Sequence, residues 1–313
     1  MKIFRDLESA RAACRPPIDR VATVGIFDGI HIGHRRLLSD LRSWAEERRV
    51  ESAVVTFSRH PREVLGGAPP LRVLSLEHRL LLLERAGVDR ALVLDFDLEL
   101  SRWSAAEFAR RVLREGLSAH GLLMGFDTTI GHRRAGSYEH LRALAPELGL
   151  EVRRAAVETL GGERVSSTLV RRAVHAGDLP RLEALLGRRF SLLGRVVHGD
   201  GRGRRVGFAT ANLDVGGAAL PPAGVYFAEA IREDGTRMPA VANIGRRPTF
   251  APASDEAPPP SVEAHLLDFT GDLYGERLEL ELLAFRRPEK KFASIDALRA
   301  QIESDIEASR AAR

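Results

Sequence analysis

The first half of the chain alternates short apolar runs with longer amphipathic stretches, and this alternation limits the fold more than any other feature. The apolar runs, each of which predicts a buried strand, are residues 20–24, 51–57, 90–95 and 121–125. The stretches with the apolar spacing of helices are residues 37–48, 76–86, 105–115 and 138–148. Strands that alternate with helices favour a parallel sheet with helices on both faces. We therefore expect an α/β domain here.

Near residue 187 the pattern changes. A helical stretch at residues 182–187 gives way to short apolar segments separated by Gly and Pro. Residues 262–268 and 277–283 alternate at period two, which is typical of half-buried strands. Short strands of this kind predict a small antiparallel barrel, and residues 294–310 predict a closing helix. We expect two domains, residues 1–186 and residues 187–313.

Composition excludes several classes of protein. The 313 residues contain one cysteine, Cys14, so no internal disulfide framework is possible. The longest aliphatic run, residues 80–83, is far shorter than the roughly 20 residues of a membrane span. The first residues mix charges too early for a signal peptide. We expect a cytoplasmic protein with no membrane partner.

The charge is basic but dispersed. The formal net charge is +4, and lysine occurs only at Lys2, Lys290 and Lys291, so arginine supplies nearly all positive charge. Arginine suits phosphate because its guanidinium group binds phosphate in two places, but genomic base composition explains the same bias equally well. No basic stripe lies along one element, so we expect no nucleic-acid partner.

A ten-residue motif, Gly25-Ile-Phe-Asp-Gly-Ile-His-Ile-Gly-His34, follows the first apolar run. Gly25 and Gly29 permit a tight turn and a close approach of backbone to phosphate. His31 and His34 are three residues apart, so at the start of a helix they share one face. Two imidazoles there, with the positive end of the helix dipole, can stabilise charge that develops on an α-phosphate. The motif therefore predicts a nucleotidyl-transfer site.

This motif resembles the signature of the histidine-x-glycine-histidine nucleotidyltransferases. More closely, it resembles the bacterial bifunctional riboflavin kinase/FAD synthetase (FMN adenylyltransferase) family. Three further segments are similar to that family: Thr56–Pro61, Met124–Asp127 and Val165–Arg171. The resemblance implies a Rossmann-like nucleotidyltransferase domain that transfers AMP from ATP to FMN, giving FAD.

The second half resembles the same family. Residues 194–213, rich in glycine, are similar to its riboflavin kinase signature. Four more segments also match: residues 222–226, 242–250, 262–269 and 287–292. The resemblance implies a six-stranded antiparallel barrel with a terminal helix, which phosphorylates riboflavin to FMN with ATP and Mg²⁺.

The resemblance also assigns roles to residues. The expected catalytic residues are Glu263, His31 and His34. The expected ATP- or phosphate-binding residues are Gly25, Phe27, Asp28, Gly29, Gly33, Ser167, Thr168, Arg171, Gly199, Gly203, Arg204 and Gly207. The expected flavin-binding residues are His60, Pro61, Asp127 and Arg287, and the expected Mg²⁺ ligands are Thr210 and Asn212.

The two reactions make different chemical demands. Phosphorylation of riboflavin activates a hydroxyl group, which requires a base such as Glu263 within hydrogen-bond reach. In the transfer of AMP to FMN the nucleophile is a phosphate that is already ionised, so positioning and charge stabilisation suffice. The expected partners are these small molecules alone, in a monomer or weak homo-oligomer. By itself, the Ser-Ser-Thr stretch at residues 166–168 is also compatible with a simple helix N-cap.

The chain departs from the family pattern at three places. Thr128 and Ile130 stand where the family has two aromatic residues, and Arg59 and Ala209 stand where it has prolines. One alternative is therefore a riboflavin kinase whose N-terminal domain is inactive or regulatory. A second alternative is an arginine-rich RNA-binding protein, since histidine-x-glycine-histidine also occurs in tRNA-charging enzymes.

Overall fold

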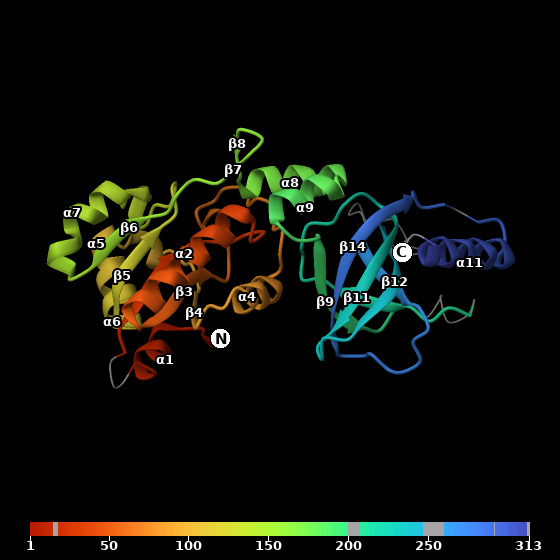
Figure 1. The fold of residues 1–313 in the computed structure, drawn as a ribbon, viewed down its shortest axis with the longest axis horizontal. Coiled ribbons are helices and arrows are strands. Elements are labelled where there is room, and N and C mark those ends of the chain that lie inside the picture. Colours follow the sequence, from red (N-terminus) through yellow and green to blue (C-terminus); the bar gives the residue numbers. More distant parts are fainter. Residues whose placement is uncertain (15–17, 200–206, 247–259, 291, 312–313) are drawn as a thin grey trace. The chain divides into compact units, whose positions relative to one another are not determined.

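The computed structural model describes residues 1–14, 18–199, 207–246, 260–290 and 292–311. These residues form two compact units. Unit 1 contains Met1–Leu71 and Arg79–Ser166, and unit 2 contains Arg72–His78 and Ser167–Arg313. Figure 1 labels the helices and strands of both. No helix among the described residues is long and apolar enough to cross a membrane.

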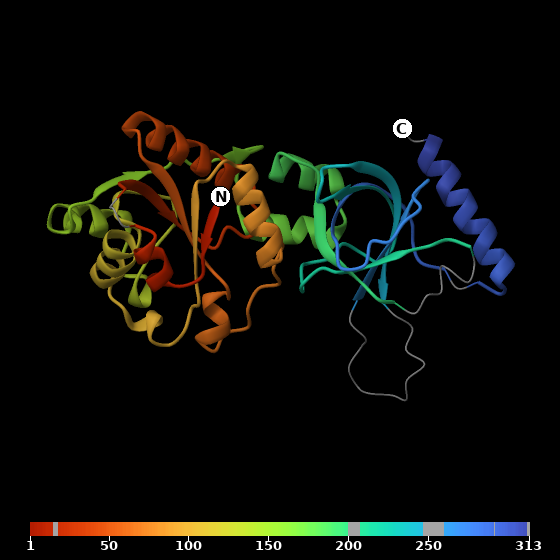
Figure 2. The same cartoon turned by 90° about the horizontal axis from the view of Figure 1, so that it is seen from below.

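Unit 1 is built on a parallel sheet of six strands in the order β1-β4-β3-β2-β5-β6. The strands are β1 Lys2–Phe4, β2 Arg20–Val24, β3 Glu51–Phe57, β4 Arg90–Leu94, β5 Ala119–Met124 and β6 Glu151–Arg154. Central strands β2 and β4 are buried along their whole length, as expected for a sheet covered on both faces. Helices flank this sheet in Figure 2.

The helices of unit 1 are short, apart from α2 and α7. They are α1 Leu7–Ala12, α2 Ile32–Arg48, α3 Pro61–Val64, η1 Leu100–Arg102, α5 Ala105–Phe108, the π-helix η2 Ala109–Arg114, α6 Glu115–Leu117, η3 His132–Arg134 and α7 Tyr138–Leu148. A small hairpin, β7 Thr159–Leu160 and β8 Glu163–Arg164, follows the sheet. Helix α4, Leu76–Arg85, contributes to both units because the division falls after His78.

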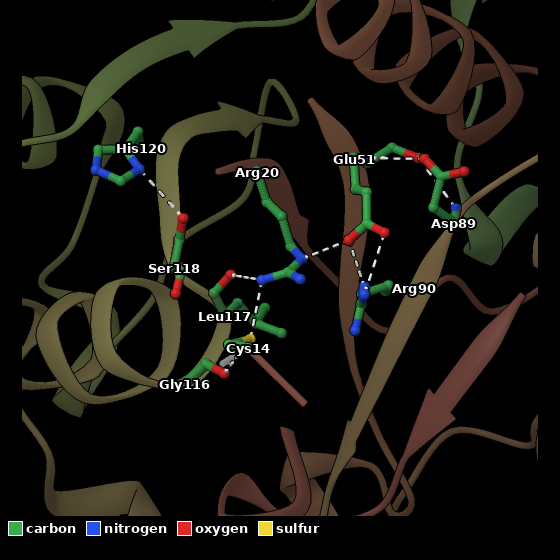
Figure 3. Close-up of polar contacts among 10 residues, drawn as sticks. Cys14, Arg20, Glu51, Asp89, Arg90, Gly116, Leu117, Ser118 and His120 are labelled. Atoms are coloured by element: carbon green, nitrogen blue, oxygen red, sulfur yellow. Dashed lines mark hydrogen bonds and ion pairs between the residues drawn. The ribbon is translucent and has the colours of Figure 1, made fainter. Parts of the chain in front are cut away.

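An ionic cluster closes the end of the sheet at which β2, β3 and β4 begin (Figure 3). The Nε atoms of Arg20 and Arg90 both donate to Oε2 of Glu51, at 2.9 and 2.5 Å. Nη1 of Arg20 also donates to the Leu117 carbonyl and to Sγ of buried Cys14. The buried arginines are thus paired, as buried charges must be. They join strands β2, β3 and β4, and Arg20 also ties β2 to the end of α6.

Unit 2 is a closed antiparallel barrel of six strands in the order β10-β13-β12-β11-β14-β9, seen nearly end-on in Figure 2. Its strands are β9 Ser191–Val197, β10 Ala211–Asp214, β11 Gly224–Arg232, β12 Arg237–Arg246, β13 Pro260–Leu266 and β14 Arg277–Arg287. The remaining helices are α8 Ser167–Ala176, α9 Leu179–Leu186 and α11 Ile295–Ala311, the last packed against β12.

Segment Arg72–His78 is held to the barrel by a buried polar cluster. Ser191 Oγ donates to Oε1 of Glu279 at 2.7 Å, and Nε2 of His78 lies 3.3 Å from both of these oxygens. The three residues are at most 3% exposed, so no substrate can reach the histidine and serine. The cluster therefore fixes the segment to β9 and β14 and is structural.

The predicted fold class is confirmed, with a parallel six-stranded sheet, an antiparallel six-stranded barrel and a terminal helix. The two short edge strands β1 and β6 were not predicted. The helix predicted at residues 37–48 starts five residues earlier, and the one predicted at 105–115 is interrupted by the π-helix. The boundary at residues 186 and 187 stays a prediction.

Candidate active sites

The loops that carry the first predicted site leave neighbouring strands of unit 1. Gly25 follows β2, His60 and Pro61 follow β3, and Asp127 follows β5. The strands β3, β2 and β5 are consecutive in the sheet and parallel. Their loops therefore meet at the carboxyl edge of the sheet, where α/β proteins bind ligands.

The turn from β2 into α2 is strained. Besides Gly29, with a φ of 94°, two larger residues have left-handed backbones: Phe27 at 54° and Ile30 at 43°. Such values are unusual for a β-branched residue and cost free energy, so surrounding contacts must enforce them. Phe27 and Ile30 are only 1% and 2% exposed, and this burial supplies the contacts. This strained turn places His31 at the N-cap of α2.

His31 and His34 form a stacked pair at the N-terminus of α2. Their ring centroids are 3.7 Å apart and the planes differ by 15°. His31 is the N-cap, and its Nδ1 accepts the backbone N–H of His34 at 3.3 Å. A Cβ added at Gly33 would lie 3.2 Å from the same Nδ1, so glycine leaves room for the His31 ring. The predicted common face of the two histidines is therefore present.

Both imidazoles of this pair are neutral at physiological pH. Burial lowers the pKa of His31 to about 4, with the charge of Asp127 opposing the shift. Burial, and then the neighbouring His31, holds the pKa of His34 well below its usual range. Because Nδ1 of neutral His31 accepts a hydrogen bond, its proton is on Nε2. His31 therefore offers an N–H donor without carrying a charge.

A pH prediction follows from the lowered pKa of His31. Below pH 6.5 the unfolded chain takes up a proton on this residue that the folded chain excludes down to about pH 4. Stability should therefore fall as pH drops through this window, by about 2 kcal/mol between pH 7 and pH 5 for this group. Trp44 and Trp103 both lie in unit 1, so tryptophan fluorescence in urea follows its unfolding.

The matched control is His31→Asn, whose side-chain oxygen keeps an N-cap acceptor but does not titrate. This variant should lose less stability than the parent chain between pH 7 and pH 5. Equal losses in the two proteins would show that His31 does not titrate with a lowered pKa.

Arg79 joins the loop after β2 to the end of β3, and no pattern in the sequence predicted this role. Its buried guanidinium donates to the carbonyl oxygen of Ile26 at 2.5 Å and to that of Phe57 at 2.6 Å. Ile26 lies in the loop that follows β2, and Phe57 is the last residue of β3. An arginine in an amphipathic helix is common, so its sequence position does not mark it. Only the fold shows that Arg79 holds Ile26 and Phe57 together at the edge of the site.

His60 and Pro61 begin helix α3. Nδ1 of His60 accepts the backbone N–H of Arg62, while Glu63 accepts the backbone N–H of His60. Pro61 occupies the first turn, where its missing N–H costs nothing. The pair thus forms a capped turn at the edge of the site, and its predicted contact with flavin stays a prediction.

The loop after β5 carries Asp127 and an aromatic residue not predicted for the site. Asp127 is exposed, lies 3.3 Å from Arg164, and is close enough to His31 to affect its pKa. Ile130 packs into the core, whereas the neighbouring Phe126 is 46% exposed beneath the Arg154 guanidinium, at 4.4 Å. Phe126 therefore supplies an aromatic ring to a loop in which Thr128 and Ile130 replace the two aromatic residues of the family.

Ser167 and Thr168 lie in the first turn of α8, and Arg171 lies one turn further along. This helix belongs to unit 2, whereas the histidine pair belongs to unit 1. All three residues therefore lie near the N-terminal end of α8. Their phosphate-binding role stays a prediction.

The second predicted site is a row of polar side chains across three adjacent barrel strands. Glu263 on β13 pairs in register with Asn212 on β10 and with Asn243 on β12. Their neighbours in sequence, including Ala211, Val262 and Ala264, are buried in the barrel, so the polar residues face outward. A carboxylate between two carboxamides is accessible to substrate at this place.

Asn212 is also packed against the glycine-rich loop. A Cβ added at Gly199 would lie 2.2 Å from Nδ2 of Asn212, so only glycine fits against this carboxamide. Gly207, with a φ of 91°, resumes the described chain three residues before Thr210, which directly precedes β10 and is half-buried. Gly203 and Arg204 lie outside the described residues.

Arg287, predicted to contact flavin, is engaged with the terminal helix. Its Nε and Nη2 donate to Oδ2 of Asp305 at 3.0 and 2.7 Å, and Asp305 is 3% exposed. This buried pair fastens α11 to the end of β14. The flavin contact of Arg287 stays a prediction.

Comparison with known proteins covers both units. Residues 15–169 match the family model for FAD synthetase, and residues 186–313 match that for riboflavin kinase. A Pseudomonas fluorescens protein described as a bifunctional riboflavin kinase/FMN adenylyltransferase is 40% identical over 99% of this chain and 97% of its own length. A protein of the same description from Escherichia coli K12 is 37% identical over 97% of this chain and 96% of its own.

A solved structure has the same fold over most of the chain. It comes from Streptococcus pneumoniae and is described as a macrolide-efflux protein. It is 31% identical, covers 94% of both chains and superposes with a TM-score of 0.79. Two family models and relatives matched over nearly their whole length lead to one assignment: this chain belongs to the bifunctional riboflavin kinase/FMN adenylyltransferase family.

Proposed function

We propose that this chain makes FMN and FAD, each on its own site. The barrel transfers the γ-phosphate of ATP to riboflavin, and the parallel-sheet domain transfers AMP from ATP to the resulting FMN. One observation carries the proposal: two sites of different chemistry occur in separate compact units, a neutral histidine pair at a helix start and an outward-facing carboxylate between two carboxamides.

For FAD formation, the phosphate of FMN attacks the α-phosphate of ATP and pyrophosphate leaves. The attacking phosphate is already ionised, so the site needs no base. The Nε2–H of His31 donates to the α-phosphate, where charge grows in the transition state, and the start of α2 adds its dipole. Neutral imidazoles suit this role because they donate without binding the product phosphate too tightly.

For FMN formation, Glu263 accepts the proton of the riboflavin 5′-hydroxyl as its oxygen attacks the γ-phosphate of ATP, and ADP leaves. Glu263 is half-buried on the outer face of the barrel, where its carboxylate can act as this base. Asn212 and Asn243 flank Glu263 in register. Their carboxamides align the riboflavin hydroxyl with the γ-phosphate of ATP. Positioning is most of the catalysis in phosphoryl transfer.

The residues of the barrel site fit Mg²⁺. Thr210 supplies a hydroxyl and Asn212 a carboxamide oxygen, and the packing of Gly199 against Asn212 limits the freedom of that side chain. Mg²⁺ takes such hard oxygen ligands, few of them from protein and the rest from water and phosphate. When bound, the ion neutralises charge on the nucleotide phosphates.

The remaining assignments complete this proposal. Residues 1–186 form the adenylyltransferase domain, with Ser167, Thr168 and Arg171 binding ATP phosphates, and residues 187–313 form the kinase domain. Riboflavin, FMN and ATP are the partners, and the chain acts in the cytoplasm as a monomer or weak homo-oligomer.

The direct test of the FAD-forming half uses FMN and Mg-ATP with the purified chain. We expect FAD and pyrophosphate in equal amounts, followed by chromatography. This assay separates the proposal from the alternative of a kinase with an inactive first domain, which rests on Thr128 and Ile130. FMN left unchanged, with riboflavin still phosphorylated, would favour that alternative.

A further inference from the structure

The proposed metal ligand Thr210 lies in a short segment outside the barrel sheet. Residues 207–210 are described without strand pairing, and β10 begins only at Ala211. A ligand on such a segment is useful only if the peptide that carries it is held in one place, because small misplacements are costly in phosphoryl transfer. The restraint on this peptide therefore matters for the reaction.

His265 supplies that restraint. It lies on β13 two residues after Glu263, and both face away from the buried Val262, Ala264 and Leu266. Nδ1 of His265 is 2.7 Å from the carbonyl oxygen of Ala209. A carbonyl only accepts, so Nδ1 is the donor, and the bond fixes the peptide group that joins residues 209 and 210.

A second contact holds the residue before. The ring of Phe208 meets the His265 ring edge to face, with centroids 5.5 Å apart and planes at 88°. One histidine thus contacts two consecutive residues immediately ahead of Thr210. Position 209 is alanine, so no proline ring fixes φ there, and the segment depends on these contacts for its conformation.

We propose that His265 is a positioning residue of the kinase site. It holds the peptide of residues 209 and 210 so that the Thr210 hydroxyl meets the metal and phosphates of ATP, and it touches no reacting atom itself. The inference rests on the proposed kinase function of the barrel. It connects strand β13, which carries the base Glu263, to the segment that carries the metal ligand.

The test uses the full chain and measures initial rates of FMN formation from riboflavin while Mg-ATP is varied. It also measures the dissociation constant of Mg-ADP by calorimetry, which should change in parallel with KM in each variant. His265→Ala should raise KM for Mg-ATP about tenfold, the equivalent of one net hydrogen bond, and change kcat by less than about threefold. His265→Asn keeps a donor at the position of Nδ1 and should return KM to within about threefold of the parent. His265→Gln, whose donor lies further out, should not.

A compensating variant tests the mechanism itself. Ala209→Pro restricts φ at the same peptide, so adding it to His265→Ala should recover most of the lost affinity, whereas in the parent chain it should change little. Ser261→Ala, on the same strand and face, is the control and should leave KM unchanged. FAD formation from FMN should be unaffected in every variant, and a kcat for FMN formation close to that of the parent shows that the barrel itself remains folded.

Three results would overturn the inference. They are an unchanged KM in His265→Ala, an equal rise in His265→Asn and His265→Ala, or no recovery with Ala209→Pro. If the parent chain itself formed no FMN from riboflavin, the proposed kinase function would fail instead, so the two failures are distinguishable.

Discussion

Replacing His31 and His34 together by alanine should abolish FAD formation and leave FMN formation intact. The two rings stack at the start of α2, and His31 offers its Nε2–H toward the site. Removal of one preorganised donor from a site of this kind typically costs 10²- to 10³-fold in kcat. We expect the double variant to lose at least about 10³-fold in FAD formation from FMN and Mg-ATP.

The controls for this variant separate chemistry from folding. His120→Ala removes an exposed histidine from β5 of the same unit and should keep full activity. Fluorescence of the two tryptophans reports whether unit 1 remains folded. A folded double variant that still made FAD at the parent rate would contradict the role given to the pair.

Replacing Glu263 by glutamine should have the opposite effect. The substitution keeps the size of the side chain and its place between Asn212 and Asn243 but removes the base. General base catalysis contributes about 10²- to 10⁴-fold, so FMN formation from riboflavin should fall by that factor. FAD formation from supplied FMN should not change. Both products can be followed by chromatography in the same samples.

Glu229→Gln is the matched control for this second variant. Glu229 is a partly exposed carboxylate on β11 of the same barrel, paired with Arg237, and surface ion pairs contribute little. Its loss should leave both reactions near the parent rate. Equal losses in Glu229→Gln and Glu263→Gln would mean that the barrel tolerates neither change, and would remove the support for a base at position 263.

The sequence predicted most of the fold because its periodicity is strong in the central elements. Helix α7 was predicted at its observed bounds, since Ser137 caps its start and Gly149 ends it with a left-handed backbone. The edge strands β1 and β6 were missed, because one has three residues and the other, Glu151–Arg154, is mostly charged. Helix α2 was started too late because a histidine, rather than a usual capping residue, is its N-cap.

The sites were predicted less completely than the fold. Spacing alone placed His31 and His34 on one face, but their neutral state depends on burial that only the folded chain reveals. Arg79 and His265 act through contacts with backbone carbonyls distant in sequence, at Ile26 and Ala209, and no local pattern marks such contacts. Residues that bind substrate form motifs, whereas residues that hold those motifs in place are visible only in three dimensions.

The central claim, that one chain performs two reactions on independent sites, is tested most directly by mixing the two variants. Supplied with riboflavin and Mg-ATP, the Glu263→Gln chain alone should make little FMN, and the His31→Ala, His34→Ala chain alone should accumulate FMN. A mixture of the two should convert riboflavin to FAD, since each variant supplies the site that the other lacks. A mixture that stops at FMN, or either variant alone forming FAD from riboflavin at the parent rate, would contradict the claim.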